Sequence, residues 1–253
     1  MSLFLILCLL NMGQLKMDDT AVFIDGGFLS KLSKHFGNGR YLVYDLIEFS
    51  RKLSRKQNLN CKKIFYYTAP PFLPSNPSPE ETKRKRDYDT FISAMKKYQD
   101  FIIREGRCQR LKINNKFEYG QKGVDSLMVM DLMDILIDFP QIKKISLIAT
   151  DSDFVPVIKK LNERNVSTIL HTYYETGRKA LFSTSNELIK SVNKYILLNK
   201  NRRGIWPPPN ILTKTTDQKL GDVLRMRIRL SGLYAPLLSL SNARPVSVNL
   251  ATS

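Results

Sequence analysis

The chain has 253 residues, which suits one α/β domain with a tail and is short for two substantial domains. It carries 40 Lys and Arg residues against 23 Asp and Glu residues, and the formal net charge of +17 predicts a polyanionic partner. Cys8, Cys61 and Cys108 are scattered and have no CxxC or His-paired spacing, which argues against a disulfide framework or a zinc site and favours a reducing, cytoplasmic setting.

An apolar run over residues 3–10 resembles the hydrophobic part of a signal peptide. No basic segment precedes it, and it is too short to cross a bilayer. We therefore interpret residues 1–17 as an N-terminal extension and expect no membrane association. Met17, just before the first predicted strand, would make a sensible alternative start, while cleavage and export is the weaker alternative.

Strands and helices follow one another in the first half of the chain. Apolar spacing predicts strand 20–24, helix 28–36, helix 44–57, strand 63–68 and, after a proline-rich loop over residues 70–79, helix 78–98. The last helix begins with four consecutive cations, Lys83 to Arg86. These four side chains suit an exposed helix face and a phosphate contact about equally well.

The middle of the chain predicts short strands and one long helix. Residues 101–103 and 107–112 have strand or hairpin character, with a turn at Asn114 and Asn115. The helix from Val124 to about Asp138 is apolar nearly all round, so we expect it to be buried between the sheet and other helices.

The acidic residues of that helix are not equivalent. At 100° per residue, Asp125 shares a face with Val129, Leu132 and Leu136. Three others lie together on another side, which we interpret as a solvated edge: Asp131, Asp134 and Asp138.

The second half continues the alternation with strand 144–149, helix 154–164, strand 166–173 and an amphipathic segment over 187–198. This order predicts an α/β fold with a mainly parallel sheet and right-handed connections. We place the domain at residues 18–200. Residues 201–253 have no sustained period and a net charge of +6, so we interpret them as a basic, weakly structured tail.

Four carboxylates follow predicted strands or begin a predicted helix: Asp25, Asp125, Asp151 and Asp153. Ligands in open α/β sheets bind at the carboxyl ends of the strands, and Mg²⁺ and Mn²⁺ prefer oxygen ligands. Each aspartate taken singly suits a helix N-cap, and Asp153 in particular could be only that. Taken together, the four favour a divalent-metal site acting on a phosphodiester.

Other catalytic patterns are not found. His35 and His171 belong to no Ser/His/Asp or Cys/His arrangement, and His171 in a predicted strand suits the core or an edge. The chain contains neither GxGxxG nor GxxxxGK[ST].

Three motifs in order carry a resemblance: residues 22–27 (VFIDGG), residues 122–125 (KGVD) with Asp131, and residues 149–154 (ATDSDF) followed by 161–166 (LNERNV). Together they resemble the NYN domain family, in its LabA-like bacterial branch, over about residues 21–198. The resemblance implies a PIN-like, Rossmann-like three-layer sandwich with an acidic Mg²⁺- or Mn²⁺-dependent site that cleaves RNA. It carries over Asp25, Asp125, Asp151 and Asp153 as metal-site acids.

Two positions qualify the resemblance. The family often has an acid at the position of Asp131, which the helical geometry sets off the face of Asp125. Many relatives have an Asn shortly after the first Asp, where this chain has Gly26, Gly27 and Phe28. A polar contact to water or phosphate is therefore missing at Phe28.

Three functions stay open at this point. The first is a metal-dependent ribonuclease, and the second is a catalytically silent RNA-binding or regulatory module on the same fold. The third is a phosphohydrolase, since Asp-x-Asp after a strand also serves aspartyl-phosphate chemistry. The third is weaker because Phe154 follows the second Asp, where Thr or Val is usual. A homo-oligomer is left open.

Overall fold

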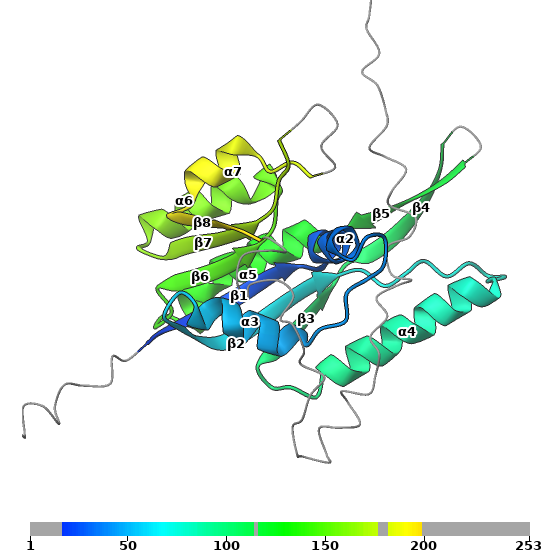
Figure 1. Cartoon of the computed structure of the whole chain (residues 1–253), viewed down its shortest axis with the longest axis horizontal. Coiled ribbons are helices and arrows are strands. Elements are labelled where there is room, and N and C mark those ends of the chain that lie inside the picture. The colour runs from blue at the N-terminus through cyan, green and yellow to red at the C-terminus, as the bar shows by residue number, and fades with distance from the viewer. Residues whose placement is uncertain (1–16, 114–115, 177–181, 199–253) are drawn as a thin grey trace, which may run out of the picture.

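The computed structural model describes residues 17–113, 116–176 and 182–198. Its centre is a six-stranded sheet in the order β3-β2-β1-β6-β7-β8, in which every neighbouring pair is parallel (Figure 1). The strands are β1 (Asp18–Asp25), β2 (Leu59–Thr68), β3 (Phe101–Glu105), β6 (Lys144–Ile148), β7 (Ser167–Thr172) and β8 (Lys194–Leu197). A separate antiparallel hairpin consists of β4 (Arg107–Ile113) and β5 (Lys116–Lys122).

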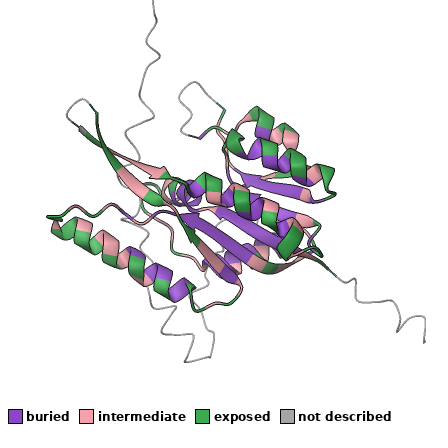
Figure 2. Ribbon diagram, turned by 180° about the vertical axis from the view of Figure 1, so that it is seen from behind, coloured by how far each residue is buried: buried purple, intermediate pink, exposed green. Residues whose placement is uncertain are grey.

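Helices cover both faces of the sheet, so the prediction of a three-layer α/β sandwich is confirmed. The helices are α2 (Gly26–Phe36), α3 (Leu46–Arg55), α4 (Pro79–Met95), α5 (Val124–Asp138), α6 (Val155–Glu163) and α7 (Asn186–Ser191), with a 3₁₀ turn, η1 (Ser152–Phe154). One core packs α2, α3 and α4 on one face, and a second packs α5, α6 and α7 on the other. Figure 2 shows the buried residues concentrated in the central strands and the helix faces against them.

Alternate residues of β1 supply the two cores. Val22 and Ile24 belong to the α2 and α3 side, whereas Ala21 and Phe23 belong to the α5 and α6 side. All four have no exposed surface. Strands of a parallel sheet covered on both faces are expected to be continuously apolar, and the sequence of β1 follows this rule.

The strand order reverses beside β1. The chain first runs outward through β2 and β3, and it then returns to place β6 on the other side of β1. Ile24 near the end of β1 pairs with Ile148 at the end of β6. The carboxyl ends of these two strands therefore form the switch point at which open α/β sheets bind ligands.

Several helices begin or end at residues whose type suits that position. Ser78 and Glu81 form a reciprocal capping box at the start of α4, and Asn165 follows α6 with a left-handed φ of 60°. Gly123 has a φ of 80° at the point where β5 turns into α5, a conformation that favours glycine.

Two predictions about the helices and strands are wrong. Residues 187–198 are not one amphipathic piece, because α7 ends at Ser191 and β8 adds a parallel edge strand beside β7. Helix α5 is not buried all round, since Met130 and Ile137 are 60% and 77% exposed. The turn at residues 114–115, most of the N-terminal extension and the tail over 201–253 lie outside the described residues. Among the described helices, none has the length and hydrophobicity of a membrane span.

Candidate active site

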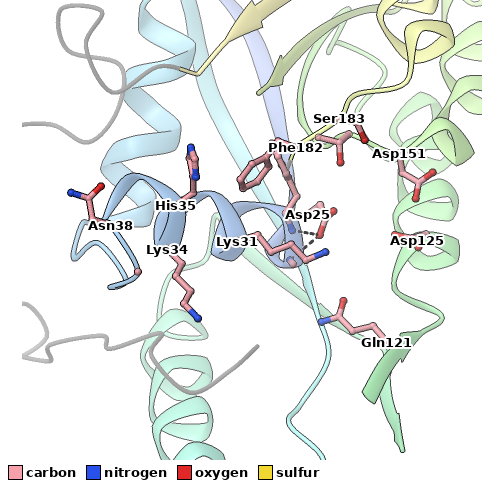
Figure 3. Close-up of a pocket in the computed structure, with 14 residues that line it drawn as sticks. Asp25, Lys31, Lys34, His35, Asn38, Gln121, Asp125, Asp151, Phe182 and Ser183 are labelled. Atoms are coloured by element: carbon pink, nitrogen blue, oxygen red, sulfur yellow. Dashed lines mark hydrogen bonds between the residues drawn. The ribbon is translucent and has the colours of Figure 1, made fainter. Parts of the chain in front are cut away.

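A cavity of about 780 Å³ opens at the switch point between β1 and β6. It lies between α2 on one side and α5 with the segment after β6 on the other (Figure 3). Three of the four predicted acids line it: Asp25, Asp125 and Asp151. They arrive from the end of β1, the first turn of α5 and the segment just after β6.

Asp25 is both a pocket residue and the N-cap of α2. Its Oδ1 accepts hydrogen bonds from the backbone N–H groups of Gly27 (2.8 Å) and Phe28 (3.1 Å). The pKa of Asp25 is raised from 3.8 to about 6. Burial is the largest cause and the charge of Asp125 adds to it, while the two N–H groups and Lys31 act in the opposite direction. The two backbone N–H groups therefore fix one oxygen of the carboxylate, while the side chain lines the cavity.

Gly26 is required where β1 turns into α2. A Cβ atom at this position would lie 2.6 Å from the carbonyl oxygen of Tyr67 and 2.7 Å from the ring of Tyr66. The close approach of β2 therefore excludes any side chain, and it sets the direction in which α2 leaves the sheet beside Asp25.

The helical spacing predicts that Asp125 begins the apolar stripe of α5. The buried residues of the helix instead begin at Val124 and continue through Met128 and Leu132, and Asp125 is exposed in the first turn. Partial burial of its carboxyl group raises the pKa of Asp125, and the charges of Asp151 and Asp153 raise it further. Asp125 lies in the first turn of α5, near the positive end of the helix dipole, and no side chain of the described residues caps this helix. The carboxylates of the site thus influence one another electrostatically through Asp125.

Asp151 and Asp153 differ in position. Asp151 lines the cavity, and its Oδ1 accepts the backbone N–H of Asp153 at 3.1 Å as the N-cap of η1. Asp153 lies within η1 and is not among the described residues that line the cavity, although its charge acts on Asp125. The helix cap that the sequence suggested for Asp153 is provided by Asp151.

The opposite wall of the cavity is basic. Lys31 and Lys34 of α2 line it, and in Figure 3 the side chain of Lys31 extends toward Asp25. Gln121 at the end of β5 and Ser183 add neutral polar groups at the edges. The cavity therefore has acidic and basic sides that face each other.

Phe28 is an apolar residue at the position where the resemblance leads us to expect a polar one. It is 5% exposed, belongs to the α2 core and meets the ring of Phe182 edge-on at a centroid distance of 6.5 Å. Both rings line the cavity. The neutral polar side chains of Asn38, Gln121, Thr150 and Ser183 also line the cavity, and none of them lies in the first turn of α2 where Phe28 is.

Asp131 lies away from this site, as the helical geometry predicts, but it is not part of a solvated edge. It is 8% exposed and accepts two hydrogen bonds from Arg104, at 2.8 and 2.9 Å, and one from the hydroxyl of Tyr67 at 2.8 Å. The correction has a simple cause: this side of α5 packs against β2 and β3 rather than facing water. Asp134 and Asp138 are exposed, as predicted.

The donor set of the cavity suits a hard cation. Its three acids provide only oxygen ligands, and their mutual repulsion is the kind that a bound Mg²⁺ or Mn²⁺ would relieve. Within the described part of the chain, no three Asp, Glu, His or Cys side chains are close enough to form a ready metal-ligand set. Because Mg²⁺ is usually held by one or two carboxylates with several waters, the residues fit such an ion without a preformed cage.

The sequence missed the residues of the basic wall. Lys31 and Lys34 are three residues apart in the predicted helix that follows Asp25, so they lie on the same helix face. This spacing is the one sequence feature that would place both side chains beside Asp25. No sequence pattern indicated that Gln121 lines the cavity, because its position depends on how the hairpin folds back onto the sheet. His171 is buried in β7, as predicted, and neither ring nitrogen has a hydrogen-bond partner among the described residues.

Comparison with known proteins identifies a family. The model of the NYN domain matches residues 19–199. No curated protein matches the chain. A solved structure of a protein of unknown function from Vibrio parahaemolyticus is 14% identical, with a TM-score of 0.46 over 75% of this chain and 98% of that chain. The match does not distinguish branches of the family, so the LabA-like assignment stays a prediction.

Proposed function

This chain belongs to the NYN domain family, whose fold is PIN-like and nuclease-related, and on that premise we propose that it is a divalent-metal-dependent ribonuclease. The observation that carries the proposal is the two-sided cavity. Asp25, Asp125 and Asp151 reach it from three separate elements, and Lys31 and Lys34 line its other wall. This combination suits a metal ion and a phosphodiester held next to each other.

The proposed roles follow from the charge of each group. Asp25, Asp125 and Asp151 would hold Mg²⁺ or Mn²⁺, with Asp153 adding negative charge from outside the cavity. When bound, the ion would lower the pKa of a water molecule and stabilise the charge that develops on the phosphodiester. Lys31 and Lys34 would bind phosphate oxygens. Gln121 would orient a phosphate or a water by hydrogen bonding.

The fixed oxygen of Asp25 supports this assignment. Two backbone N–H groups hold its Oδ1, so the side chain cannot rotate freely. A carboxylate held in this way presents its second oxygen to the cavity at little cost in side-chain entropy.

The test is cleavage of a labelled single-stranded RNA with Mn²⁺, Mg²⁺ or EDTA. We expect cutting with either metal and none with EDTA. A water nucleophile leaves no 2′,3′-cyclic phosphate, whereas attack by the 2′-hydroxyl does, so analysis of the product ends separates this activity from a metal-independent contaminant. Cutting that persists in EDTA would contradict the proposal.

The second candidate is an RNA-binding or regulatory module without turnover. Two points favour it. No ready set of three ligands exists among the described residues, and the buried, apolar Phe28 lies where the resemblance leads us to expect a polar residue. Salt-dependent RNA binding without cleavage in any divalent metal would support it. The phosphohydrolase alternative is weaker, because Asp153 of its Asp-x-Asp pair is not among the described residues that line the cavity.

A further inference from the structure

The hairpin of β4 and β5 projects beyond the sheet and leads back to the cavity. Figure 1 shows it extending away from the sheet, and Figure 2 shows no buried residue along its projecting part. Its inner end is fixed to the site, since Gln121 of β5 lines the cavity and Asp125 follows four residues later. A ligand lying on the hairpin would therefore enter the cavity from this side.

One face of the hairpin is defined by its register. Arg110 pairs with Tyr119, Lys112 pairs with Phe117 and Cys108 pairs with Gln121. Cross-strand partners, and residues two positions apart on one strand, point to the same side of a sheet. Phe117, Tyr119 and Gln121 therefore lie on one face of the hairpin, together with Arg110 and Lys112. Phe117 and Gln121 are about 13 Å apart along the strand, at the usual rise of a strand, and Gln121 is at the cavity.

Aromatic rings and cations alternate on this face. The guanidinium of Arg110 lies 4.7 Å from the ring centroid of Phe72 and 4.4 Å from that of Phe117. The rings of Phe72 and Tyr119 are 5.9 Å apart. Phe72 comes from the loop after β2, so a second segment supports the stack. Arg110 joins these rings into one platform.

The platform remains open to solvent. Phe117 is 54% exposed, and Arg110 and Lys112 are exposed as well. Within the described ranges, neither Arg110 nor Lys112 forms a salt bridge, so both charges are available to a ligand beside the exposed ring of Phe117. The hairpin also carries Arg107 and Lys122 at its base against a single acid, Glu118, so its charge complements a polyanion.

We propose that this face, formed by Arg110, Lys112, Phe117 and Tyr119 with Phe72, binds single-stranded RNA and directs it into the cavity. The inference rests on the proposed function, and it adds the substrate form and the path of the strand. Stacking on aromatic rings needs unstacked bases, which a duplex does not offer. The lysine and arginine side chains neutralise the backbone phosphates.

The test is an equilibrium binding assay in EDTA with a fluorescent oligouridine of about ten nucleotides, so that binding is measured without metal or turnover. Phe117→Ala is expected to weaken binding by about tenfold, because it removes one base-stacking ring. Leu111→Ala is the matched control. Leu111 lies on the opposite face of the same hairpin and is similarly exposed, at 43%, so its loss is expected to change affinity by less than about twofold.

A second pair separates stacking from charge. Arg110→Ala and Lys112→Ala each remove one cation from this face, and each should lower the salt dependence of binding by a similar amount, about one phosphate contact. Arg110→Ala should in addition lose about as much affinity as Phe117→Ala, because Arg110 holds that ring. A blunt RNA duplex of the same length should bind more weakly and be insensitive to Phe117→Ala.

The outcomes distinguish this inference from the ribonuclease proposal. If Phe117→Ala loses single-strand binding but the parent protein shows no metal-dependent cleavage, the proposed binding face is supported and the ribonuclease proposal is overturned. If the parent protein cleaves RNA with metal but the Phe117→Ala and Leu111→Ala proteins bind RNA equally well, the ribonuclease proposal is supported and the proposed binding face is overturned. Equal or tighter binding of the duplex would also overturn it, and so would an absence of RNA binding.

Discussion

Arg104 on β3 holds Asp131 on α5 through two hydrogen bonds, Nε to Oδ2 at 2.8 Å and Nη2 to Oδ1 at 2.9 Å. The hydroxyl of Tyr67 donates a third bond to Oδ2 at 2.8 Å. Both carboxylate oxygens are therefore engaged, which ties α5 to the edge of the sheet. An acid used in this way serves the fold and is not free to bind a metal.

Asp131→Asn should consequently lower stability and leave the metal site intact. Loss of a two-point ion pair with a half-exposed arginine should cost about 1–2 kcal/mol of unfolding free energy, measured by urea denaturation. Asp134→Asn is the matched control on the same helix, because Asp134 is exposed, and it should change stability little. Loss of Mn²⁺ binding in Asp131→Asn with unchanged stability would instead assign Asp131 to the metal site.

Two substitutions of Asp25 should separate its capping role from its charge. Asp25→Asn keeps an oxygen that can accept the N–H groups of Gly27 and Phe28, whereas Asp25→Ala removes the cap. The alanine variant should therefore be about 1 kcal/mol less stable than the asparagine variant by thermal or urea unfolding. Both should lose metal-dependent cleavage. Full activity in Asp25→Asn would remove Asp25 from the list of metal ligands.

Removal of one carboxylate should stabilise the metal-free protein. Burial and the charges of Asp151 and Asp153 raise the pKa of Asp125. The ionised carboxylate therefore has a higher free energy in the folded protein than in the unfolded chain, and it destabilises the fold. Asp125→Asn should raise Tm in EDTA. It should also reduce the increase in Tm that Mn²⁺ gives the parent protein, because fewer ligands remain. A lower Tm in EDTA would mean that Asp125 makes a stabilising contact instead.

His171 should make the protein sensitive to acid. Burial lowers its pKa from 6.5 to about 4, so the unfolded chain takes up a proton at a higher pH than the folded chain. The contribution to stability is complete above pH 6.5 and is lost as the pH falls toward 4, by up to about 3 kcal/mol. Urea denaturation across this range should be less pH-dependent in His171→Leu than in the parent. An identical pH dependence in both proteins would contradict the assignment.

Residues whose position depends on local pattern were predictable. Asp25 and Asp151 follow apolar strands, and strand ends in a parallel sheet meet at one edge. Asp125 lies in the first turn of α5, as the predicted start of that helix required, although the buried stripe begins one residue earlier at Val124. These three needed only the bounds of each element and the rule that parallel strands end together.

Residues whose position depends on packing between distant segments were not predictable. The surroundings of Asp131 required knowing that α5 lies against Tyr67 and Arg104. The role of Gln121 required the path of the hairpin. Strand β8 is only four residues long, and its register beside β7 is fixed by long-range pairing that leaves a weak local pattern.

The most direct test of the central claim is single-turnover cleavage of a labelled single-stranded RNA in Mn²⁺ by the parent protein, Asp151→Asn and Asp134→Asn. Asp151 lines the cavity, whereas Asp134 is an exposed acid on α5, so the two variants remove the same charge from different places. We predict that Asp151→Asn loses at least about a hundredfold in rate while Asp134→Asn keeps the parental rate, with both proteins folded. Equal rates in all three proteins would contradict the assignment of the cavity as a ribonuclease site.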